Sequence, residues 1–417
     1  MKFSKFATRF GGQSGIAQLM EDLGDAMAGK QDVMMLGGGN PSHIPQVQKF
    51  FHERMQRILD DPVEFAHLIG DYDSPQGELQ FIQALAKLLK SSYGWDIKSE
   101  NITLTAGSQS GFFLLFNMFA GEYDNGEFKK ILLPMAPEYI GYADVGLSDN
   151  MFIARRPSIE KIDQHRFKYH VNFDDLNVTE EIGALCVSRP TNPTGNVLSD
   201  EELNNLLVIA NNHEVPLIID NAYGTPFPNI VFTEANPLWT DNTILCMSLS
   251  KIGLPGTRTG IIIAREEVIK AIANMNAILN LALGSFGPGL MLDLVKSGDI
   301  TNLSNSVIRP YYQKNALRAI ALLDQELEGV NYFIHKAEGA IFLWLWLPDL
   351  PISSQELYER LKQRDVLVIS GHHFFPGLDE DWAHKHECLR ITYSMQEDIV
   401  KRGVRIIAEE VKKAYKC

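Results

Sequence analysis

The sequence contains few cysteines, and they lie far apart. Only four occur among 417 residues, and no two form a Cys-x-x-Cys pair. A disulfide framework is therefore not expected, and the spacing disfavours a thiolate metal site. Scattered thiols are typical of a protein from a reducing compartment, so we expect a cytoplasmic protein. The cysteines are Cys186, Cys246, Cys388 and Cys417.

The sequence also lacks an excess of positive charge and any long apolar run. Its 38 Lys and Arg against 52 Asp and Glu give a net charge of -14, which argues against nucleic acid or an anionic membrane as the main partner. The apolar run 341–347 is too short to span a bilayer, and Pro348 ends it. The first 20 residues contain no apolar run of signal length.

The histidine-rich stretch is the remaining place to look for a metal. The stretch lacks the regularly spaced carboxylates or thiols of a metal-binding helix, so we predict a polar loop rather than a metal site. Its members are His372, His373, His384 and His386.

Length and patterning predict two domains and an α/β fold. Continuous apolar runs alternate with helical patterns, as in a mostly parallel sheet that is buried on both faces. A helix over 200–210 has Ser199 or Asp200 as its N-cap, and another covers 111–119. The predicted strands are 102–104, 131–133, 184–188, 217–220, 244–247 and 260–264.

The C-terminal third has a different, α+β pattern that predicts a smaller second domain. Helical patterns cover 308–326, 354–364 and 398–414, and strand patterns cover 332–335, 341–347, 366–369 and 389–393. We therefore expect a large domain at 46–305 and a small domain at 306–417. Residues 1–45 are expected to pack with the small domain.

Lys251 is the residue that points most directly to chemistry. It follows the predicted strand 243–247, with Ser248 and Ser250 before it and Arg258 seven residues later. A lysine that attacks a carbonyl must lose its proton, and a desolvated, cation-rich site lowers its pKa. An arginine beside hydroxyl groups suits a phosphate monoester. Together these features predict pyridoxal phosphate, and the alternative is a solvated surface lysine.

Segments at the ends of other predicted strands carry compatible groups. Residues 105–110 open a helix, where free N–H groups can bind an anion, although an ordinary helix cap has the same pattern. Tyr139 can lie flat on a heteroaromatic ring, or it is a core or interface tyrosine. Asn192 lies between Pro190 and Pro193, which would hold its amide rigidly, and a plain turn is the alternative.

Two charged residues complete the set. Asp220 ends an apolar strand, where a protonated pyridine nitrogen would be a suitable partner for a buried carboxylate. A helix N-cap is the alternative for Asp220. Arg390 begins an apolar strand and can present a bidentate fork to an α-carboxylate, and a surface salt bridge is its alternative.

The order of these segments resembles the fold-type I pyridoxal-phosphate aminotransferases of class I/II, over essentially the whole chain. Segments 192–195, 220–223 and 248–251 are similar to that family's signature segments. The resemblance implies that Lys251 forms the imine with the cofactor and shuttles the proton. It also implies that Asp220 pairs with the pyridine nitrogen, while Asn192 and Tyr223 bind the phenolic oxygen. Tyr139 would stack on the ring.

The same resemblance assigns the phosphate and the substrate. The phosphate would be held by the backbone N–H groups of Ser108 and Gln109, by Ser248 and by Arg258. Tyr72 would reach the phosphate of a neighbouring subunit, which implies a homodimer with shared active sites. Arg390 would bind the substrate carboxylate, helped by Gly39 and Asn192.

Departures from the aspartate-specific branch imply a small, neutral, branched aliphatic amino acid. The stacking residue is Tyr139 rather than tryptophan, and the loop to Arg258 is one residue shorter. No arginine occurs between Arg265 and Arg309, where that branch has a carboxylate clamp, and residues 284–288 offer an apolar, uncharged wall. By resemblance the substrates are an amino acid and a 2-oxo acid, L-valine with pyruvate, in a ping-pong transamination.

Two alternatives remain open at this point. One is another enzyme of the same fold, an aromatic or aminoadipate aminotransferase or a carbon–sulfur lyase. The other is a transcriptional regulator that shares the fold and binds DNA. The regulator would need a basic helix-turn-helix extension, and this acidic chain begins directly with transaminase-like sequence.

Overall fold

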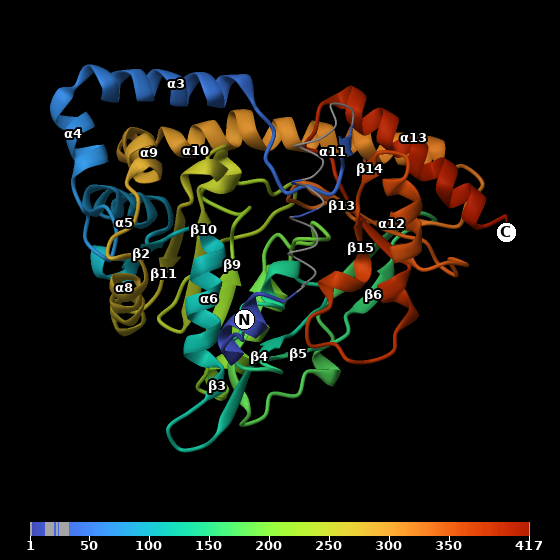
Figure 1. Cartoon of the computed structure of the whole chain (residues 1–417), viewed down its shortest axis with the longest axis horizontal. Coiled ribbons are helices and arrows are strands. Elements are labelled where there is room, and N and C mark those ends of the chain that lie inside the picture. Colours follow the sequence, from blue (N-terminus) through green and yellow to red (C-terminus); the bar gives the residue numbers. More distant parts are fainter. Residues whose placement is uncertain (1, 13–20, 22–23, 25–32, 417) are drawn as a thin grey trace.

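The computed structural model describes residues 2–12, 21, 24 and 33–416. Its central sheet has eight strands in the order β2-β11-β10-β9-β8-β4-β3, with β5 beside β4 (Figure 1). Each of the six predicted strands of this region is present. The strands are β2 (Ile102–Thr105), β3 (Gly121–Glu122), β4 (Phe128–Leu133), β5 (Phe152–Ala154), β8 (Ile182–Ser188), β9 (Leu217–Asp220), β10 (Thr243–Ser248) and β11 (Gly260–Ile263).

The central sheet is mostly parallel, as predicted. β5, β4, β8, β9 and β10 run parallel, while β11 is antiparallel to both β10 and β2. Register places Ser188 beside Asp220, and Asp220 beside Cys246. The carboxyl ends of the parallel strands therefore meet at one edge, where a ligand site is expected.

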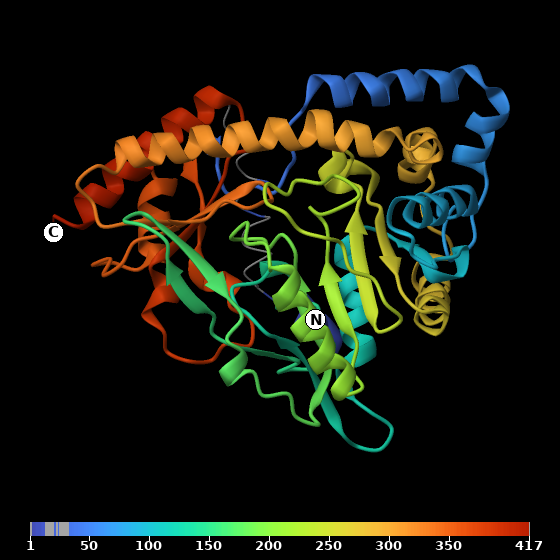
Figure 2. The same ribbon diagram turned by 180° about the vertical axis from the view of Figure 1, so that it is seen from behind.

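Helices cover both faces of this sheet. Figure 1 shows α6 (Ser108–Phe119) on the near face, and Figure 2 shows α7 (Asp200–Asn212) on the opposite face. The predicted cap of α7 is confirmed at Ser199, whose Oγ accepts from the Glu202 N–H at 3.1 Å. The Glu202 carboxylate in turn accepts from the Ser199 N–H at 2.8 Å, which completes a capping box. Around one end of the sheet lie α5 (Leu79–Tyr93), α8 (Glu266–Asn280) and α9 (Phe286–Ser297).

The second sheet has six strands in the order β15-β16-β13-β12-β7-β6. Its strands are β6 (Ser158–Lys161), β7 (Arg166–His170), β12 (Phe333–His335), β13 (Phe342–Trp346), β15 (Ile369–Ser370) and β16 (Cys388–Thr392). β6 and β7 were not among the predicted strands, because charged residues interrupt their apolar pattern. The predicted strand at 366–369 divides: β14 (Val366–Leu367) pairs with β1 (Met34–Met35), and β15 pairs with β16.

One long helix extends past both sheets. α11 (Arg309–Glu326) follows α10 (Asp299–Leu303) and a π-helical turn, and it runs as a long orange rod along the top of Figure 2, above both sheets. α12 (Ser354–Lys362) packs on β15 of the second sheet and on α13 (Glu397–Ala414), which also packs on α11 and on the two-stranded sheet β1-β14 (Figure 1). The N-terminal part contributes α1 (Lys5–Phe10), α3 (Pro45–Asp60) and α4 (Pro62–Gly70).

The segment before α3 contacts the C-terminal part of the chain. The Leu36 carbonyl accepts from the Thr392 N–H at 2.7 Å, and the Ser394 hydroxyl donates to the Asn40 carbonyl at 2.8 Å. These contacts bring residues 36–40 to the edge of the second sheet. The division into 1–45, 46–305 and 306–417 stays a prediction, and much of its first part lies outside the described residues.

The cysteines and histidines are placed as follows. Cys186, Cys246 and Cys388 are free and buried, and Cys417 lies outside the described residues. No group of three His, Cys, Asp or Glu side chains in the described part of the chain is arranged for a metal ion. The predicted polar loop is wrong for His384, which is buried beside Tyr169 and Cys388. Among the described helices, none is long and apolar enough to cross a membrane.

Candidate active site

Lys251 lies just beyond the carboxyl end of β10, in the short 3-10 turn Ser250–Ile252. Its Nζ donates to the Gly39 carbonyl at 2.6 Å, so two segments 212 positions apart meet at this amine. Burial, together with the positive charges of Arg390 and Arg258, lowers the Lys251 pKa from 10.5 to about 8. The neutral, nucleophilic amine is therefore accessible near neutral pH, as the sequence predicted.

Asp220 ends β9, next to β10. Its Oδ1 accepts from the Ala222 N–H at 3.0 Å, and its Oδ2 accepts from the Tyr142 hydroxyl at 2.8 Å. Burial raises the Asp220 pKa above its ordinary value, against these two hydrogen bonds and the charge of Lys251. A cationic ring nitrogen beside this carboxylate would lower the Asp220 pKa again and favour the ionised form.

Arg390 is buried in β16, with Trp344 of β13 on one side and Ile369 of β15 on the other. Its Nη1 donates to Asn192 Oδ1 at 2.6 Å, and its Nη2 donates to the Gly37 carbonyl at 2.6 Å. Its Nε–H has no partner among the described residues. Burial lowers the Arg390 pKa to about 10, which still leaves the guanidinium charged at neutral pH. An orphaned donor on a buried cation suits an anionic ligand.

Two tyrosines stand beside these charged groups. Tyr223 is buried, and Lys251 Nζ lies 5.4 Å from the centroid of its ring. The Tyr139 ring meets Tyr142 edge-on, with centroids 5.4 Å apart and an interplanar angle of 89°. Burial raises the pKa of Tyr139 and of Tyr223, so both are neutral hydroxyl donors near neutral pH. A Cβ at Gly141 would overlap the Tyr139 ring, so glycine is required for this ring position.

The start of α6 carries the donors from which an anion site is predicted. The Ser108 and Gln109 N–H groups have no backbone acceptor among the described residues, as expected for a first helical turn. Gly107 precedes them with φ +87°, and the Arg258 guanidinium packs so closely on it that a Cβ would overlap the side chain. Ser248 ends the neighbouring strand β10. These groups come from three separate segments, and the phosphate that they are expected to share stays a prediction.

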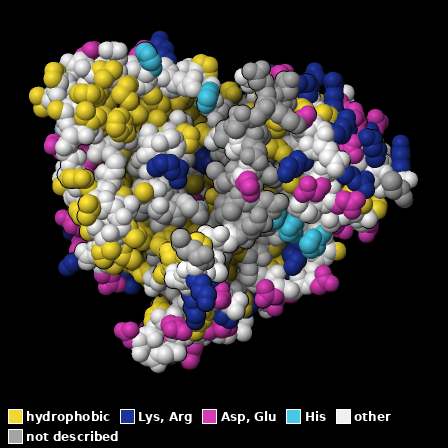
Figure 3. All heavy atoms as spheres, in the orientation of Figure 1, with side chains coloured by type: hydrophobic (Ala, Val, Ile, Leu, Met, Phe, Trp, Pro, Cys, Tyr) yellow, Lys and Arg dark blue, Asp and Glu magenta, His cyan; other side chains and the backbone are white. Residues whose placement is uncertain are grey.

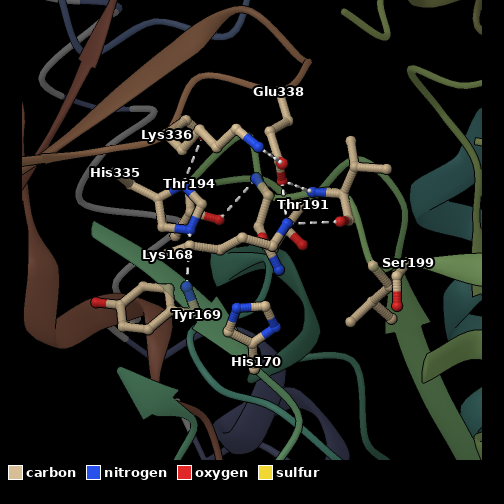
Figure 4. A network of polar contacts seen from close by, with 12 residues as sticks. Lys168, Tyr169, His170, Thr191, Thr194, Ser199, His335, Lys336 and Glu338 are labelled. Atoms are coloured by element: carbon tan, nitrogen blue, oxygen red, sulfur yellow. Dashed lines mark hydrogen bonds and ion pairs between the residues drawn. The ribbon is translucent and has the colours of Figure 1, made fainter. Parts of the chain in front are cut away.

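A buried ion pair holds the loop that carries Asn192. Figure 4 shows this pair, Lys168 and Glu338, beside Thr191 and Thr194 of the loop. Lys168 of β7 pairs with Glu338, and its Nζ also donates to the Val197 carbonyl at 2.9 Å. Glu338 Oε2 accepts from the Val197 N–H at 3.1 Å. Within the loop, the Thr191 N–H donates to the Asn196 carbonyl at 2.8 Å. The second sheet thereby holds a loop of the first.

Sequence reasoning missed several residues at this site. Tyr142, the partner of Asp220, received no role in the sequence analysis. Lys168 and Glu338 gave no signal, because their partnership joins positions 170 apart. Glu138 could have been found from the sequence, because it is a carboxyl in an apolar segment and directly precedes Tyr139.

Two predicted features do not join this constellation. Tyr72 is 85% exposed, and no hydrogen bond, ion pair or ring contact among the described residues links it to the other site residues. The uncharged segment 284–288 begins α9, where Gly287 packs on Thr257 and Thr259 of the loop around Arg258. Its predicted place beside the substrate side chain stays a prediction.

Comparison with known proteins gives a consistent result. Residues 31–407 match the profile of the family described as aminotransferase class I and II. The valine–pyruvate aminotransferase of Escherichia coli K12 is 51% identical, covering 100% of this chain and 99% of that protein. A crystal structure of valine–pyruvate aminotransferase from Salmonella typhimurium LT2 is 51% identical with a TM-score of 0.89, and the match covers 96% of this chain and 100% of that chain. A crystal structure described as an amino-acid aminotransferase from Psychrobacter arcticum 273-4 has a TM-score of 0.97 at 47% identity. That match covers 100% of this chain and 99% of the other.

Proposed function

The chain belongs to the class I and II aminotransferases, and we propose that it moves the amino group between L-valine and pyruvate. The products would be 3-methyl-2-oxobutanoate and L-alanine. The observation that carries this proposal is the 51% identity, over essentially full length, to a valine–pyruvate aminotransferase. The protein is a pyridoxal-phosphate-dependent enzyme, and the cofactor is pyridoxal 5′-phosphate.

The donors at the site fit this cofactor. We assign its phosphate to the N–H groups of Ser108 and Gln109, to Ser248 and to Arg258. Gly107 supports this assignment, because its missing side chain leaves room for Arg258 against the helix start. We assign the ring to the face of Tyr139, with Asn192 and Tyr223 at the phenolic oxygen and Asp220 at the nitrogen. When bound, the cofactor supplies an electron sink for the electron pair left at Cα.

Lys251 would do the proton chemistry. Its lowered pKa, about 8, leaves a useful fraction of neutral amine at neutral pH. Nζ would take the proton from Cα of the amino acid as a general base and later deliver it as an acid. The amino acid leaves as its 2-oxo acid before the second 2-oxo acid binds, which makes the reaction ping-pong.

Arg390 would hold the carboxylate common to both substrates. Its free Nε–H and its charge support this role, and its hydrogen bond to Asn192 orients the fork. We also assign Gly39 to the substrate, because the hydrogen bond from Lys251 Nζ to its carbonyl places this backbone segment at the site. The chain has no arginine from 266 to 308, the region from which the aspartate-specific branch binds the side-chain carboxylate of its substrate. The absence of this cation supports a substrate with a neutral side chain, such as valine.

A half-reaction scan tests the proposal. Single amino acids are added to the purified enzyme loaded with pyridoxal phosphate, and the cofactor's visible absorbance is followed. We expect L-valine and L-alanine to react at least about tenfold faster than L-tyrosine or L-2-aminoadipate, the discrimination that a shaped apolar pocket can give. Faster reaction with tyrosine or aminoadipate would assign a different aminotransferase activity. Release of a thiol from cystathionine would assign a lyase.

We also propose that the enzyme is a homodimer with shared sites. Figure 3 shows hydrophobic side chains gathered on the face where Figure 1 places α3 and α4. Apolar patches of this kind are typical of subunit interfaces. Exposed apolar residues of these helices and of the α8–α9 region include Leu59 (53%), Val63 (80%), Ile69 (57%), Ile278 (82%) and Leu281 (68%).

Tyr72 is the residue proposed to cross this interface. Its ring is exposed and would reach the phosphate of the partner subunit. Mixing Tyr72→Phe subunits with Lys251→Ala subunits tests this, because a mixed dimer with shared sites contains one intact site. We expect the mixed dimer to combine turnover, which the Lys251→Ala parent lacks, with tight cofactor binding, which the Tyr72→Phe parent lacks. No recovery in an isolated mixed dimer would contradict shared sites.

The buried free thiols are compatible with the cytoplasmic location that we also propose.

A further inference from the structure

Glu138 is a fully buried carboxyl that the proposed reaction does not use. Only 1% of its surface is exposed, and it directly precedes Tyr139. Its Oε1 accepts from the Ser188 N–H at 2.9 Å, and its Oε2 lies in hydrogen-bond contact with the Ser188 hydroxyl. No cation forms an ion pair with Glu138 among the described residues. A buried carboxylate without a cation is costly, whereas a neutral carboxylic acid is not.

A chain of hydroxyl groups connects Glu138 to Asp220. The Ser188 Oγ lies 3.4 Å from the Tyr142 hydroxyl, and that hydroxyl donates to Asp220 Oδ2 at 2.8 Å. The links are held rigidly, since β8 and β9 place Ser188 and Asp220 in direct register. Tyr142 is itself buried between Phe112 and Phe116, with ring centroids 4.9 and 5.1 Å away.

The number of hydrogens decides how this chain is oriented. Each hydroxyl carries one hydrogen, and Tyr142 gives its own to Asp220. If Glu138 is neutral, its hydrogen goes to Ser188, and the Ser188 hydrogen turns to Tyr142. Every bond then points toward Asp220. If Glu138 is ionised, the Ser188 hydrogen turns back to it, and the Tyr142 oxygen loses a donor.

The electrostatics favour the neutral form. Burial raises the Glu138 pKa to about 8, against the Ser188 hydrogen bonds, and the negative charge of Asp220 raises it further. Glu138 and Asp220 compete for negative charge in one buried network, and only Asp220 has a positive group, Lys251, acting on it. Placing the charge on Asp220 and the proton on Glu138 avoids two buried anions.

We propose that Glu138 is a positioning residue: a neutral carboxylic acid that, through Ser188 and Tyr142, directs hydrogen bonds onto Asp220. This inference rests on the proposed function, in which Asp220 receives the ring nitrogen of the cofactor. Glu138 touches neither substrate nor cofactor. It keeps Asp220 the anion of the pair and fixes the orientation of its carboxylate.

Infrared difference spectroscopy of the protein without cofactor tests the protonation directly. We expect the wild-type spectrum minus that of Glu138→Gln at neutral pH to contain the carbonyl band of a protonated carboxyl. Glu202→Gln is the matched control, because Glu202 is also buried, but its hydrogen bonds to His170 and to backbone N–H groups outweigh burial and lower its pKa to about 2. That control should remove a carboxylate band instead. A carboxylate band lost in Glu138→Gln would overturn the proposal.

Cofactor affinity tests the positioning role. The amide of Glu138→Gln can donate to the Ser188 hydroxyl and accept from its N–H, so the affinity of the cofactor-free protein for pyridoxal phosphate should stay within about threefold of wild type. Glu138→Leu and Tyr142→Phe break the chain and should weaken affinity about tenfold or more. If Gln loses as much affinity as Leu, an ionised Glu138 is required and the proposal is wrong.

Folding and function remain separable in these tests. Tyr142→Phe keeps the ring between Phe112 and Phe116, so it reports on the hydroxyl even if Glu138→Leu does not fold. Failure of the wild-type protein to bind pyridoxal phosphate would refute the proposed function, while the infrared result would still report whether Glu138 is protonated. Conversely, an ionised Glu138 in a working aminotransferase would refute only the positioning role.

Discussion

Arg390 and Asn192 form one unit: Nη1 of the arginine donates to Oδ1 of the asparagine at 2.6 Å, across 198 positions of sequence. Arg390 belongs to the second sheet, and Asn192 to a loop at the edge of the first. Phe342 and Phe374 lie 4.1 and 5.0 Å from the guanidinium carbon, measured to the ring centroids. This hydrogen bond thus fixes Arg390, the predicted carboxylate-binding residue, relative to Asn192, a predicted ring-binding residue.

Arg390→Lys is therefore expected to damage substrate binding strongly. An ammonium cannot keep the bond to Asn192, the bond to Gly37 and a substrate carboxylate in the same planar arrangement. We expect KM for L-valine and for pyruvate to rise about 10- to 100-fold, since a hydrogen bond to a charged group contributes roughly 1.5–3 kcal/mol. Steady-state kinetics measure this. Arg318→Lys, at an exposed pair with Glu397, is the control and should leave KM unchanged.

Gly107→Ala is expected to weaken cofactor binding without unfolding the protein. The new methyl group would displace the Arg258 guanidinium from the start of α6, and the backbone there has φ +87°. We expect the dissociation constant for pyridoxal phosphate to rise at least about tenfold, as for the loss of one charge-assisted hydrogen bond. The measurement is a titration of the cofactor-free protein.

Gly126→Ala is the matched control for that experiment. Gly126 has nearly the same backbone angle, φ +83°, and a Cβ there would meet nothing within 4 Å. Both variants carry the backbone strain, and only Gly107→Ala moves Arg258. Equal effects of the two variants on cofactor affinity would show that strain, not the guanidinium, is responsible.

Lys251→Met is expected to stabilise the cofactor-free protein at neutral pH. The Lys251 pKa falls from 10.5 to about 8 on folding, so protonated Lys251 opposes folding. This penalty is complete below about pH 8 and vanishes as the pH rises to 10.5, where both states are neutral. We expect a gain of about 1–3 kcal/mol at pH 7 that shrinks by pH 10. Urea denaturation at the two pH values measures it, and a gain that grows with pH would contradict the assignment.

The parts of the fold that were predictable are those where local pattern and burial agree. β8, β9 and β10 are apolar runs buried on both faces, and their ends place Asp220 and Lys251 at the same sheet edge. A continuous apolar run that ends in a polar residue identifies such a strand from sequence alone. The motif residues Lys251, Asp220, Asn192 and Tyr223 lie near these strand ends for the same reason.

The parts that were missed depend on contacts between distant positions. β7 is a mixed run with Lys168 inside it, and its strand identity comes from pairing with β6 and β12. The Lys168 charge is tolerated because Glu338 faces it, 170 positions away. The Tyr142 bond to Asp220 is also non-local, joining positions 78 apart. Hydrophobic periodicity carries no information about such pairs.

Glu338→Gln is expected to destabilise the protein and to loosen the loop that carries Asn192, of which Figure 4 labels Thr191 and Thr194. It would leave Lys168 charged and without its buried partner, a change that typically costs about 3–5 kcal/mol. Burial raises the Glu338 pKa, but Lys168, together with hydrogen bonds from Lys336 and the Val197 N–H, outweighs burial and holds the pKa below its ordinary 4.5. The stability that the ionised Glu338 contributes is therefore lost as the pH falls below that value. Denaturation at pH 7 measures the effect. Glu397→Gln, at an exposed pair, should cost less than about 1 kcal/mol. The double variant Lys168→Met, Glu338→Gln separates folding from positioning. If it recovers stability but not the affinity for pyridoxal phosphate, the ion pair positions Asn192. If it recovers both, the ion pair contributes only to folding.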